Sequence, residues 1–183
     1  KNTITGINAF LDYDDEGNTR SSIGLEFRRS AVEAIVNAYF GLSNANEIGA
    51  FTERVLDGNE ITIIGEVPYI PWANIVFNHY EWQADKNSKN SKGDKFSAEL
   101  ALTPNLIVEV GQDSNNIDGS NNFAKVSVVY PSRDRVSLKD GVTADVMFTS
   151  GDISSQMLSK VRRTNTMIIE SEGTGVVIAR ATE

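Results

Sequence analysis

The sequence predicts an all-β protein, an antiparallel up-and-down transmembrane β-barrel, and three observations favour this fold class. Apolar and polar residues alternate along eight segments, which is the period of a strand with one apolar face. The connections between these segments tend to alternate in length. Aromatic residues gather at the two ends of one segment, as they do at the two interfaces of a membrane barrel.

Eight strands are expected, bounded by turn-forming residues. They cover residues 3–13, 21–28, 32–42, 58–67, 73–83, 95–103, 106–112 and 122–130. In the second strand, Ile23, Leu25 and Phe27 share one face, and the residues between them are polar or glycine. No run of roughly 18 apolar residues occurs, so no transmembrane helix is expected, whereas a membrane strand needs only about ten alternating residues.

The connections indicate which ends of the strands lie together. Long polar connections are predicted at 13–20, 43–57, 84–94 and 113–121, and short ones at 29–31, 68–72 and 104–105. Every second connection of an up-and-down array lies at the same end, so one end would carry long wet loops and the other tight turns. This asymmetry is typical of outer-membrane barrels.

The stretch from Glu66 to Trp82 contains two prolines, Pro68 and Pro71, between alternating segments. Proline has no backbone donor, so the pair predicts a stiff corner outside the hydrogen-bonded ladder. The aromatic residues around the next strand suit two interfacial girdles. They are Tyr69 and Trp72 at one end and Tyr80 and Trp82 at the other. Aromatic residues also end the strands of soluble sandwiches or mark a protein-binding patch, so this feature alone leaves both interpretations open.

The composition excludes several classes of function. The chain has 25 acidic and 17 basic residues and a net charge of −8, which argues against a nucleic-acid-binding surface or a broad anionic-lipid patch. It has no cysteine, so neither disulfides nor thiolate sites can form, and its single histidine excludes a polyhistidine metal site. The chain opens at Lys1 without an initiator Met or a secretory signal, so we expect a processing site or a truncation there.

No catalytic, cofactor-binding or metal-binding residues are predicted. His79 shares a strand face with Phe77 and Glu81, and no nucleophile or orienting acid can be placed beside it, so a structural, hydrogen-bonded role is expected. The acidic runs at 12–16 and 113–118 lack the ligand register of a calcium loop. The GTGVV stretch at 173–177 lacks the spacing of a phosphate-binding loop.

The first strands resemble a known family. Residues 5–30, TGINAFLDYDDEGNTRSSIGLEFRRS, and 36–43, VNAYFGLS, are similar to the opening of the intimin and invasin β-domain, the inverse autotransporter family. The matching residues are Gly6, Asn8, Asp12, Tyr13, Asp14, Gly17, Arg20, Gly24, Glu26, Tyr39, Phe40, Leu42 and Ser43. Gly41 stands where the family has proline. A later family stretch is matched at Gly65, Pro68, Pro71 and Tyr80, although Tyr69 and Ile70 depart from its spacing.

A second match follows the last strand. Residues 161–170, VRRTNTMIIE, resemble the linker box that follows these barrels, with Val161, Arg163, Asn165 and Glu170 identical in register. The resemblance runs in order from about residue 3 to about residue 171.

The resemblance implies a twelve-stranded barrel of the bacterial outer membrane whose C-terminal segment is threaded back through the lumen. Eight strands are visible, so four would lie upstream of Lys1 or be supplied otherwise; a closed eight-stranded barrel is an alternative. The expected units are barrel strands in 1–131, a lumen-threading linker or plug in 132–172, and a short extension in 173–183.

The implied function is export and surface display of a C-terminal passenger, as in type V secretion and cell adhesion. The implied partners are outer-membrane lipid, the barrel assembly machinery during insertion, and a passenger or host-surface ligand. The alternative is a soluble β-sandwich or barrel that binds carbohydrate or another ligand, with Trp72, Tyr80 and Trp82 as stacking platforms. An enzyme is the third and least favoured hypothesis.

The tail after the last strand suits a hydrated lumen. Residues 132–160 are polar and mixed in charge, and 154–163 can form a short helix. We expect basic tail residues to meet lumen-facing carboxylates such as Glu26, Glu33, Glu66, Glu99 and Glu109. The basic residues are Arg133, Arg135, Lys139, Lys160, Arg162 and Arg163. A solvated surface tail is the alternative, because charge runs usually mark solvated faces.

Overall fold

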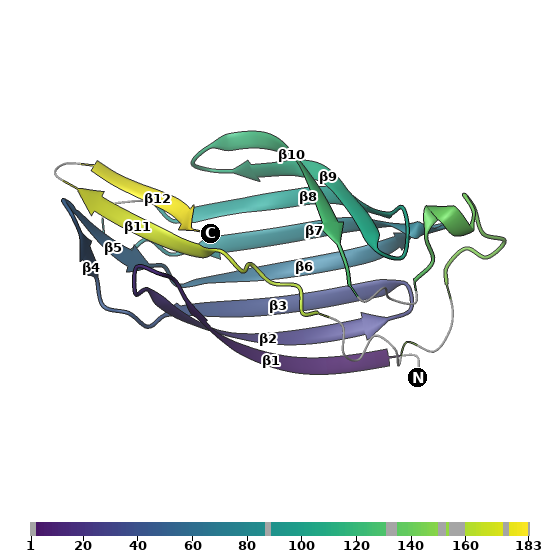
Figure 1. Cartoon of the computed structure of the whole chain (residues 1–183), viewed down its shortest axis with the longest axis horizontal. Coiled ribbons are helices and arrows are strands. Elements are labelled where there is room, and N and C mark those ends of the chain that lie inside the picture. The colour runs from purple at the N-terminus through teal and green to yellow at the C-terminus, as the bar shows by residue number, and fades with distance from the viewer. Residues whose placement is uncertain are drawn as a thin grey trace.

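The computed structural model describes residues 3–86, 89–130, 135–149, 153, 160–173 and 176–182. Its main element is an eight-stranded antiparallel sheet of strand order β1-β2-β3-β6-β7-β8-β9-β10 (Figure 1). The strands are β1 (Thr3–Tyr13), β2 (Thr19–Arg29), β3 (Val32–Gly41), β6 (Gly58–Val67), β7 (Ile70–Trp82), β8 (Ser91–Ala101), β9 (Leu106–Asn115) and β10 (Gly119–Val128). All eight predicted strands are confirmed, and they pair in the predicted up-and-down order.

A smaller four-stranded sheet lies at one end of the large sheet, and we call it the end sheet (Figure 1). It contains β4 (Asn46–Ile48), β5 (Phe51–Val55), β11 (Met167–Gly173) and β12 (Val176–Thr182), in the order β12-β11-β5-β4. The long connection predicted at 43–57 is present between β3 and β6, but it contains two short strands that were not expected. Segments more than a hundred residues apart in the chain complete this sheet, so local periodicity could not reveal it.

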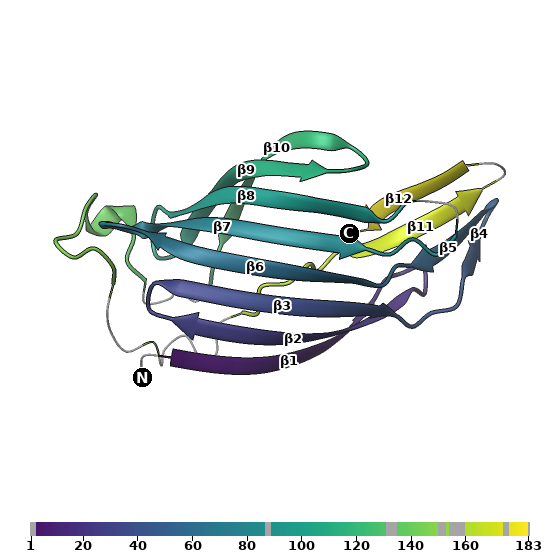
Figure 2. The ribbon, with the colours of Figure 1, turned by 180° about the vertical axis from the view of Figure 1, so that it is seen from behind.

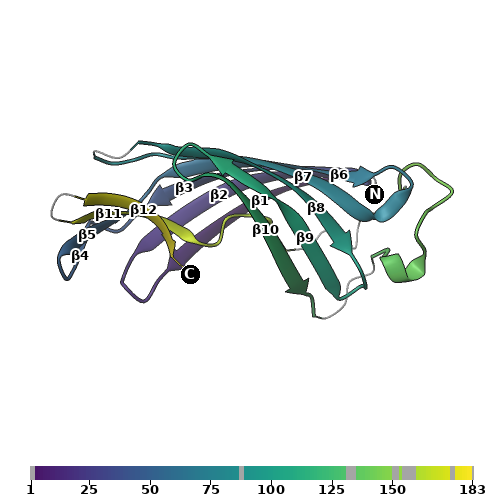
Figure 3. The same cartoon turned by 90° about the horizontal axis from the view of Figure 1, so that it is seen from above.

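The large sheet is open, because β1 and β10 are its two edges within the described residues. The closed eight-stranded alternative is therefore not observed. A physical reason is space: a closed eight-stranded barrel is just wide enough for its own side chains. Here the sheet is arched, and the C-terminal segment runs along its concave side (Figure 3).

The two faces of the arch differ sharply in polarity. The outer face, seen in Figure 2, carries exposed apolar side chains such as Ile7, Leu25 and Val128, which are 77%, 60% and 78% exposed. The inner, concave face buries polar and charged residues, among them Arg20, Ser22, Arg28, Asn37, Glu60, Thr62, Ser97 and Glu99. A sheet that packs its own core in water shows the opposite arrangement. The alternation therefore places hydrocarbon-like surface outside and a polar interior inside, as in a membrane barrel.

Two of the predicted long loops are tight turns. Residues 14–18 join β1 to β2, and 116–118 join β9 to β10, while the loops predicted there spanned 13–20 and 113–121. The strands continue into polar residues, so that Asp113, Ser114 and Asn115 pair across to β10. These polar strand ends were predicted as loops because composition does not reveal backbone pairing.

The only helix within the described residues is a short 3₁₀ turn, Leu138–Asp140. No helix in these ranges is long and apolar enough to span a membrane. The short helix predicted at 154–163 falls mostly on 154–159, which lie outside the described residues.

A small apolar cluster closes the inner face beside the end sheet. Tyr39, Leu56, Tyr80 and Trp82 form it, and Ile168 of the tail packs against it. The rings of Tyr39 and Trp82 lie 5.1 Å apart, centroid to centroid. Tyr80 and Trp82 are 8% and 3% exposed, so the prediction that these two rings form an outward-facing girdle is wrong. They have the strand parity of inner-face Asn78, and an inward ring cannot reach a lipid interface.

Candidate functional site

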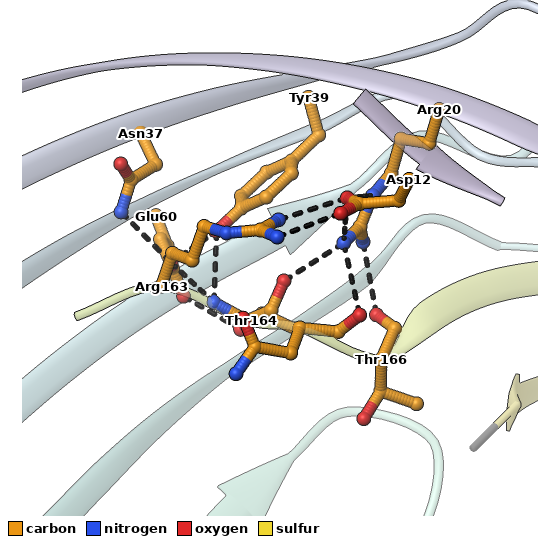
Figure 4. Close-up of polar contacts among 9 residues, drawn as sticks. Asp12, Arg20, Asn37, Tyr39, Glu60, Arg163, Thr164 and Thr166 are labelled. Carbon is orange, nitrogen blue, oxygen red and sulfur yellow. Dashed lines mark hydrogen bonds and ion pairs between the residues drawn. The ribbon is translucent and has the colours of Figure 1, made fainter. Parts of the chain in front are cut away.

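The best-defined polar site is a set of inner-face side chains that holds tail residues 162–166. We call this set the tail clamp, and its members are Asp12, Arg20, Asn37, Tyr39, Glu60 and Glu99. The clamp draws on strands β1, β2, β3, β6 and β8, so the whole curvature of the sheet is needed to bring it together. Figure 4 shows the central part of the site.

Arg20 is the most heavily used residue of the clamp. Its guanidinium is completely buried and donates to the carbonyl oxygens of Thr164, Asn165 and Thr166 at 2.8, 3.3 and 2.9 Å. Its carbon Cζ lies 4.6 Å from the centre of the Tyr39 ring. The planar fork of arginine suits such convergent contacts. Because it donates to three successive carbonyl oxygens, Arg20 fixes the path of the tail backbone.

Asp12 supplies the negative charge between two arginines. Arg20 donates to Asp12 Oδ2 through Nη2 at 2.9 Å, and Arg163 binds both carboxylate oxygens at 2.8 and 2.6 Å. The Arg163 guanidinium also lies 4.2 Å from the centre of the Phe10 ring. Paired, charge-assisted contacts of this kind are the strong ones in proteins. They tie a tail side chain to β1 and β2 together.

Glu60 holds the tail through neutral donors. It accepts hydrogen bonds from the Thr164 N–H at 2.9 Å, the Thr164 hydroxyl at 2.8 Å and Asn37 Nδ2 at 3.0 Å. The Tyr39 hydroxyl also donates to Glu60, and it accepts a bond from the Thr164 N–H at 2.9 Å. A buried carboxylate is costly unless its oxygens are satisfied. Thr164 thus supplies two of the donors that satisfy Glu60, and Asn37, Tyr39 and Asn78 supply the others.

The expectation that basic tail residues meet inner-face carboxylates is confirmed at Glu99. Arg162 forms an ion pair with Glu99, and Arg135 Nη1 lies 3.8 Å from the same carboxylate. Arg163 forms its ion pair with Asp12, which was not among the expected carboxylates. Arg133 lies outside the described residues. Of the other four predicted carboxylates, Glu66 accepts from Thr149 of the tail, which is not a basic residue. Glu26 and Glu33 pair with Arg28, and Glu109 accepts from Ser97.

The turn between β6 and β7 binds an earlier part of the tail. Tyr69 has a left-handed backbone, with φ of 62°, which is unfavourable for a bulky residue. Its N–H donates to Met147 O, and its carbonyl accepts from Ala144 N, both at 2.9 Å. Trp72 Nε1 donates to Val142 O at 2.8 Å. The tail thus contacts the strained turn, and Pro71 lies where β7 has slipped out of register with β6.

At the opposite end, the tail joins the end sheet. Glu170 is buried, and its Oε2 accepts a hydrogen bond from the Asp85 N–H at 2.7 Å. Leu56 N–H donates to Ile168 O at 2.9 Å, next to the β5–β11 ladder. The described parts of the tail therefore contact the sheet at three successive places: the β6–β7 turn, the clamp and β5.

The linker residues identified from the sequence differ in the contacts that they make. Arg163 and Glu170 make the side-chain contacts described above. Asn165 contributes its carbonyl to Arg20, and its side chain is exposed, while Val161 is half-buried. Tyr69 is half exposed beside Pro68 in the turn, and Trp72 is tied to the tail. The stacking platform of Trp72, Tyr80 and Trp82 is not formed, because Tyr80 and Trp82 are buried.

Four residues that matter most were given no role from the sequence: Asn37, Glu60, Arg20 and Thr164. Strand parity offered a signal for Glu60 and Asn37. Asn37 stands between apolar Val36 and Ala38, and Glu60 alternates with outward Ile61 and Ile63, so both polar side chains must face inward. Nothing in the sequence indicates that they meet Thr164, which is 104 residues away from Glu60 along the chain.

Gly24 is needed because two asparagine side chains pack over it. A Cβ at this position would lie 2.2 Å from Asn37 Oδ1 and 2.8 Å from Asn8 Oδ1. Asn37 cannot move freely, since its Nδ2 donates to Glu60 and to Arg162 O. We expect Gly24→Ala to lower the free energy of unfolding by about 1–3 kcal/mol, as overpacking does, measured as the urea midpoint in detergent.

The matched control for Gly24→Ala is Gly6→Ala on the same face. A Cβ at Gly6 would meet only Glu26 Cβ at 3.8 Å, an ordinary contact. Equal urea midpoints for the two variants would contradict the role given to Gly24.

His79 lies on the outer face, where its Nδ1 is 2.8 Å from Asp94 Oδ1. This hydrogen bond agrees with the structural role expected for it. Within the described ranges, no group of three or more His, Asp or Glu side chains is arranged to hold a metal ion.

Comparisons with known proteins agree with this fold. A family model described as the inverse autotransporter β-domain matches residues 1–165. A solved chain, from work on the mechanism of in-meso crystallization of membrane proteins, is similar with a TM-score of 0.76 and 20% identity. The match covers 93% of this chain and 75% of that one, and at this identity it supports the fold alone. No curated protein matches. The chain belongs to the inverse autotransporter β-domain family, whose members are β-barrels of the bacterial outer membrane.

Proposed function

We propose that this chain anchors and exports a C-terminal passenger, with residues 132–172 threaded through the lumen of its barrel and 173–183 as a short extension beyond it. The family is one of translocators and anchors, not of enzymes. Its location also implies insertion by the barrel assembly machinery. The passenger, any host-surface ligand and a role in adhesion belong to the proposal.

The observation that carries this proposal is the tail clamp. A surface tail would have its polar groups in water, whereas residues 162–166 lie against the buried polar face and bind carboxylates and Arg20 there. The contacts involve side chains from five strands, which a tail on the outer face could not reach. The apolar outer face is then free to contact lipid.

The open edges of the sheet support a larger barrel. An unpaired strand edge is not stable in lipid, because each unsatisfied backbone group costs several kcal/mol there. β1 and β10 therefore need further strands beside them in the membrane. A twelve-stranded barrel, as the family has, meets this requirement and leaves room for the tail. The strands within residues 1–131 would form part of that barrel.

The test is the location of the C-terminus in intact cells. With an epitope tag appended after Glu183, we expect an external protease to remove the tag without permeabilisation of the outer membrane. The protein should also require detergent for extraction and migrate differently on gels before and after heating. A periplasmic protein serves as the control for membrane integrity. A tag cleaved only after permeabilisation would contradict the proposed topology.

The soluble binding module lacks the surface that it requires. Its stacking platform needs exposed rings, but Tyr80 donates its hydroxyl to Asp113 and Trp82 packs on Tyr39, both on the inner face. The apolar outer face would also be the water-exposed one.

A further inference from the structure

The loop between β3 and β6 contains a strand whose partner comes from the tail. β5 pairs with β11 in antiparallel register, from Ile169 opposite Val55 to Glu172 opposite Thr52. Without β11, one edge of β5 would offer unpaired backbone groups. Such an edge is a ready template for an added strand.

Contacts from a second loop, between β7 and β8, favour β11 as the occupant of this edge. The Asp85 N–H donates to the buried Glu170 at 2.7 Å, and Lys86 Nζ lies 3.3 Å from Glu172 Oε2. Arg54 of β5 lies 3.2 Å from Asp85, which joins the two loops. Ile169 and Met167 are almost completely buried. The site therefore recognises both the backbone and the side chains of β11.

We propose that β5 is a receptor strand, which captures residues 167–173 by β-strand addition as they leave the barrel and keeps the tail from sliding back. The proposal rests on the outward topology proposed above. The clamp fixes residues 162–166 inside, and the receptor strand fixes the segment that follows. The partner is a segment of this same chain, recognised by its extended backbone, two buried apolar side chains and two glutamates.

The pairing itself can be tested by cross-linking, because the chain has no cysteine of its own. Glu53 and Ser171 are directly opposite each other, and Ser171 Oγ lies 3.4 Å from Glu53 Oε1. We expect Glu53→Cys with Ser171→Cys to form a disulfide within the full chain in the outer membrane. The control pair is Asn46→Cys with Ser171→Cys, which β5 separates. Two strand spacings, about 9.6 Å, exceed the reach of a disulfide. Failure of the first pair, or equal yields for both, would overturn the proposal.

The importance of the backbone ladder is tested at Arg54. Leu56 N–H donates to Ile168 O, and donors alternate along a strand, so the Arg54 N–H also faces β11. Arg54→Pro removes this donor and the side chain, while Arg54→Ala removes the side chain alone. In intact cells we expect protease to cleave the tail roughly tenfold faster in Arg54→Pro, and within about twofold of the wild-type rate in Arg54→Ala.

The outcomes separate the two proposals. Both variants must retain heat-modifiable mobility, which shows that the barrel is folded. A tag outside the cell with equal cleavage rates in the two variants would contradict the receptor strand alone. A wild-type tag that is reached only after permeabilisation would contradict the outward topology itself.

Discussion

Asp12→Asn is expected to destabilise the folded protein by about 3–5 kcal/mol, because it leaves two arginines without their shared counter-charge. Arg20 is completely buried, and Arg163 binds both oxygens of Asp12. Asparagine keeps the shape of the side chain but replaces one acceptor with a donor that faces a guanidinium. The loss should appear as a lower urea midpoint in detergent, followed through the fluorescence of the two tryptophans.

Two controls define this result. Asp15→Asn changes an exposed residue of the neighbouring turn by the same chemistry and should be close to neutral. The double variant Asp12→Asn with Arg163→Gln removes a charge from each side, so its cost should be smaller than the sum of the two single costs. Additive costs, or an Asp12→Asn midpoint equal to that of Asp15→Asn, would show that the ion pair does not hold the tail.

The sequence allowed the large sheet to be predicted because every strand carries its own signal. A period of two is local, so Ile23, Leu25 and Phe27 indicate both a strand and the face that meets lipid. Hairpin order then follows from the short connections. The same reasoning cannot predict whether the edges meet, since closure depends on the number of strands and their stagger.

The end sheet and the clamp were beyond such reasoning because their contacts are long-range. β5 is five residues long, and its pattern, Phe-Thr-Glu-Arg-Val, includes a buried Glu53 that reads as loop polarity. It pairs with a segment more than a hundred residues later. Likewise, an arginine in the tail predicts some carboxylate partner, but only the path of the chain selects Asp12 for Arg163 over the five carboxylates expected.

The error over the aromatic girdle had a different cause, because the sequence did contain the answer. Tyr80 and Trp82 are an even number of residues from Asn78, whose side chain bonds inner-face Thr62, whereas outward Phe77 lies on the other parity. Position along the strand indicated an interface, but parity indicated the interior. Parity decides, because neighbouring side chains of a strand point to opposite faces.

Leu25→Arg is expected to cost about 2–4 kcal/mol of stability when the protein is folded in lipid bilayers, because the new charge would lie at the depth of the hydrocarbon core. Leu25 lies near the middle of β2, and the side chains opposite it, Ile7 on β1 and Val36 on β3, are also exposed and apolar. An arginine there must be desolvated or must draw water into the hydrocarbon. The measurement is the urea dependence of folding into lipid vesicles.

The control is a second arginine at a different depth, because the stability cost depends on depth only if the outer face lies in a membrane. Ser21 lies on the same face of β2, two alternations closer to the strand end, so Ser21→Arg should cost about 0–1 kcal/mol. In water, an arginine at the 60%-exposed Leu25 would be nearly neutral and would improve solubility. Equal, small costs at both positions would mean that the outer face does not meet lipid. A larger loss of stability for Leu25→Arg than for Ser21→Arg would show that the apolar residues of the alternating pattern face the hydrocarbon of the bilayer.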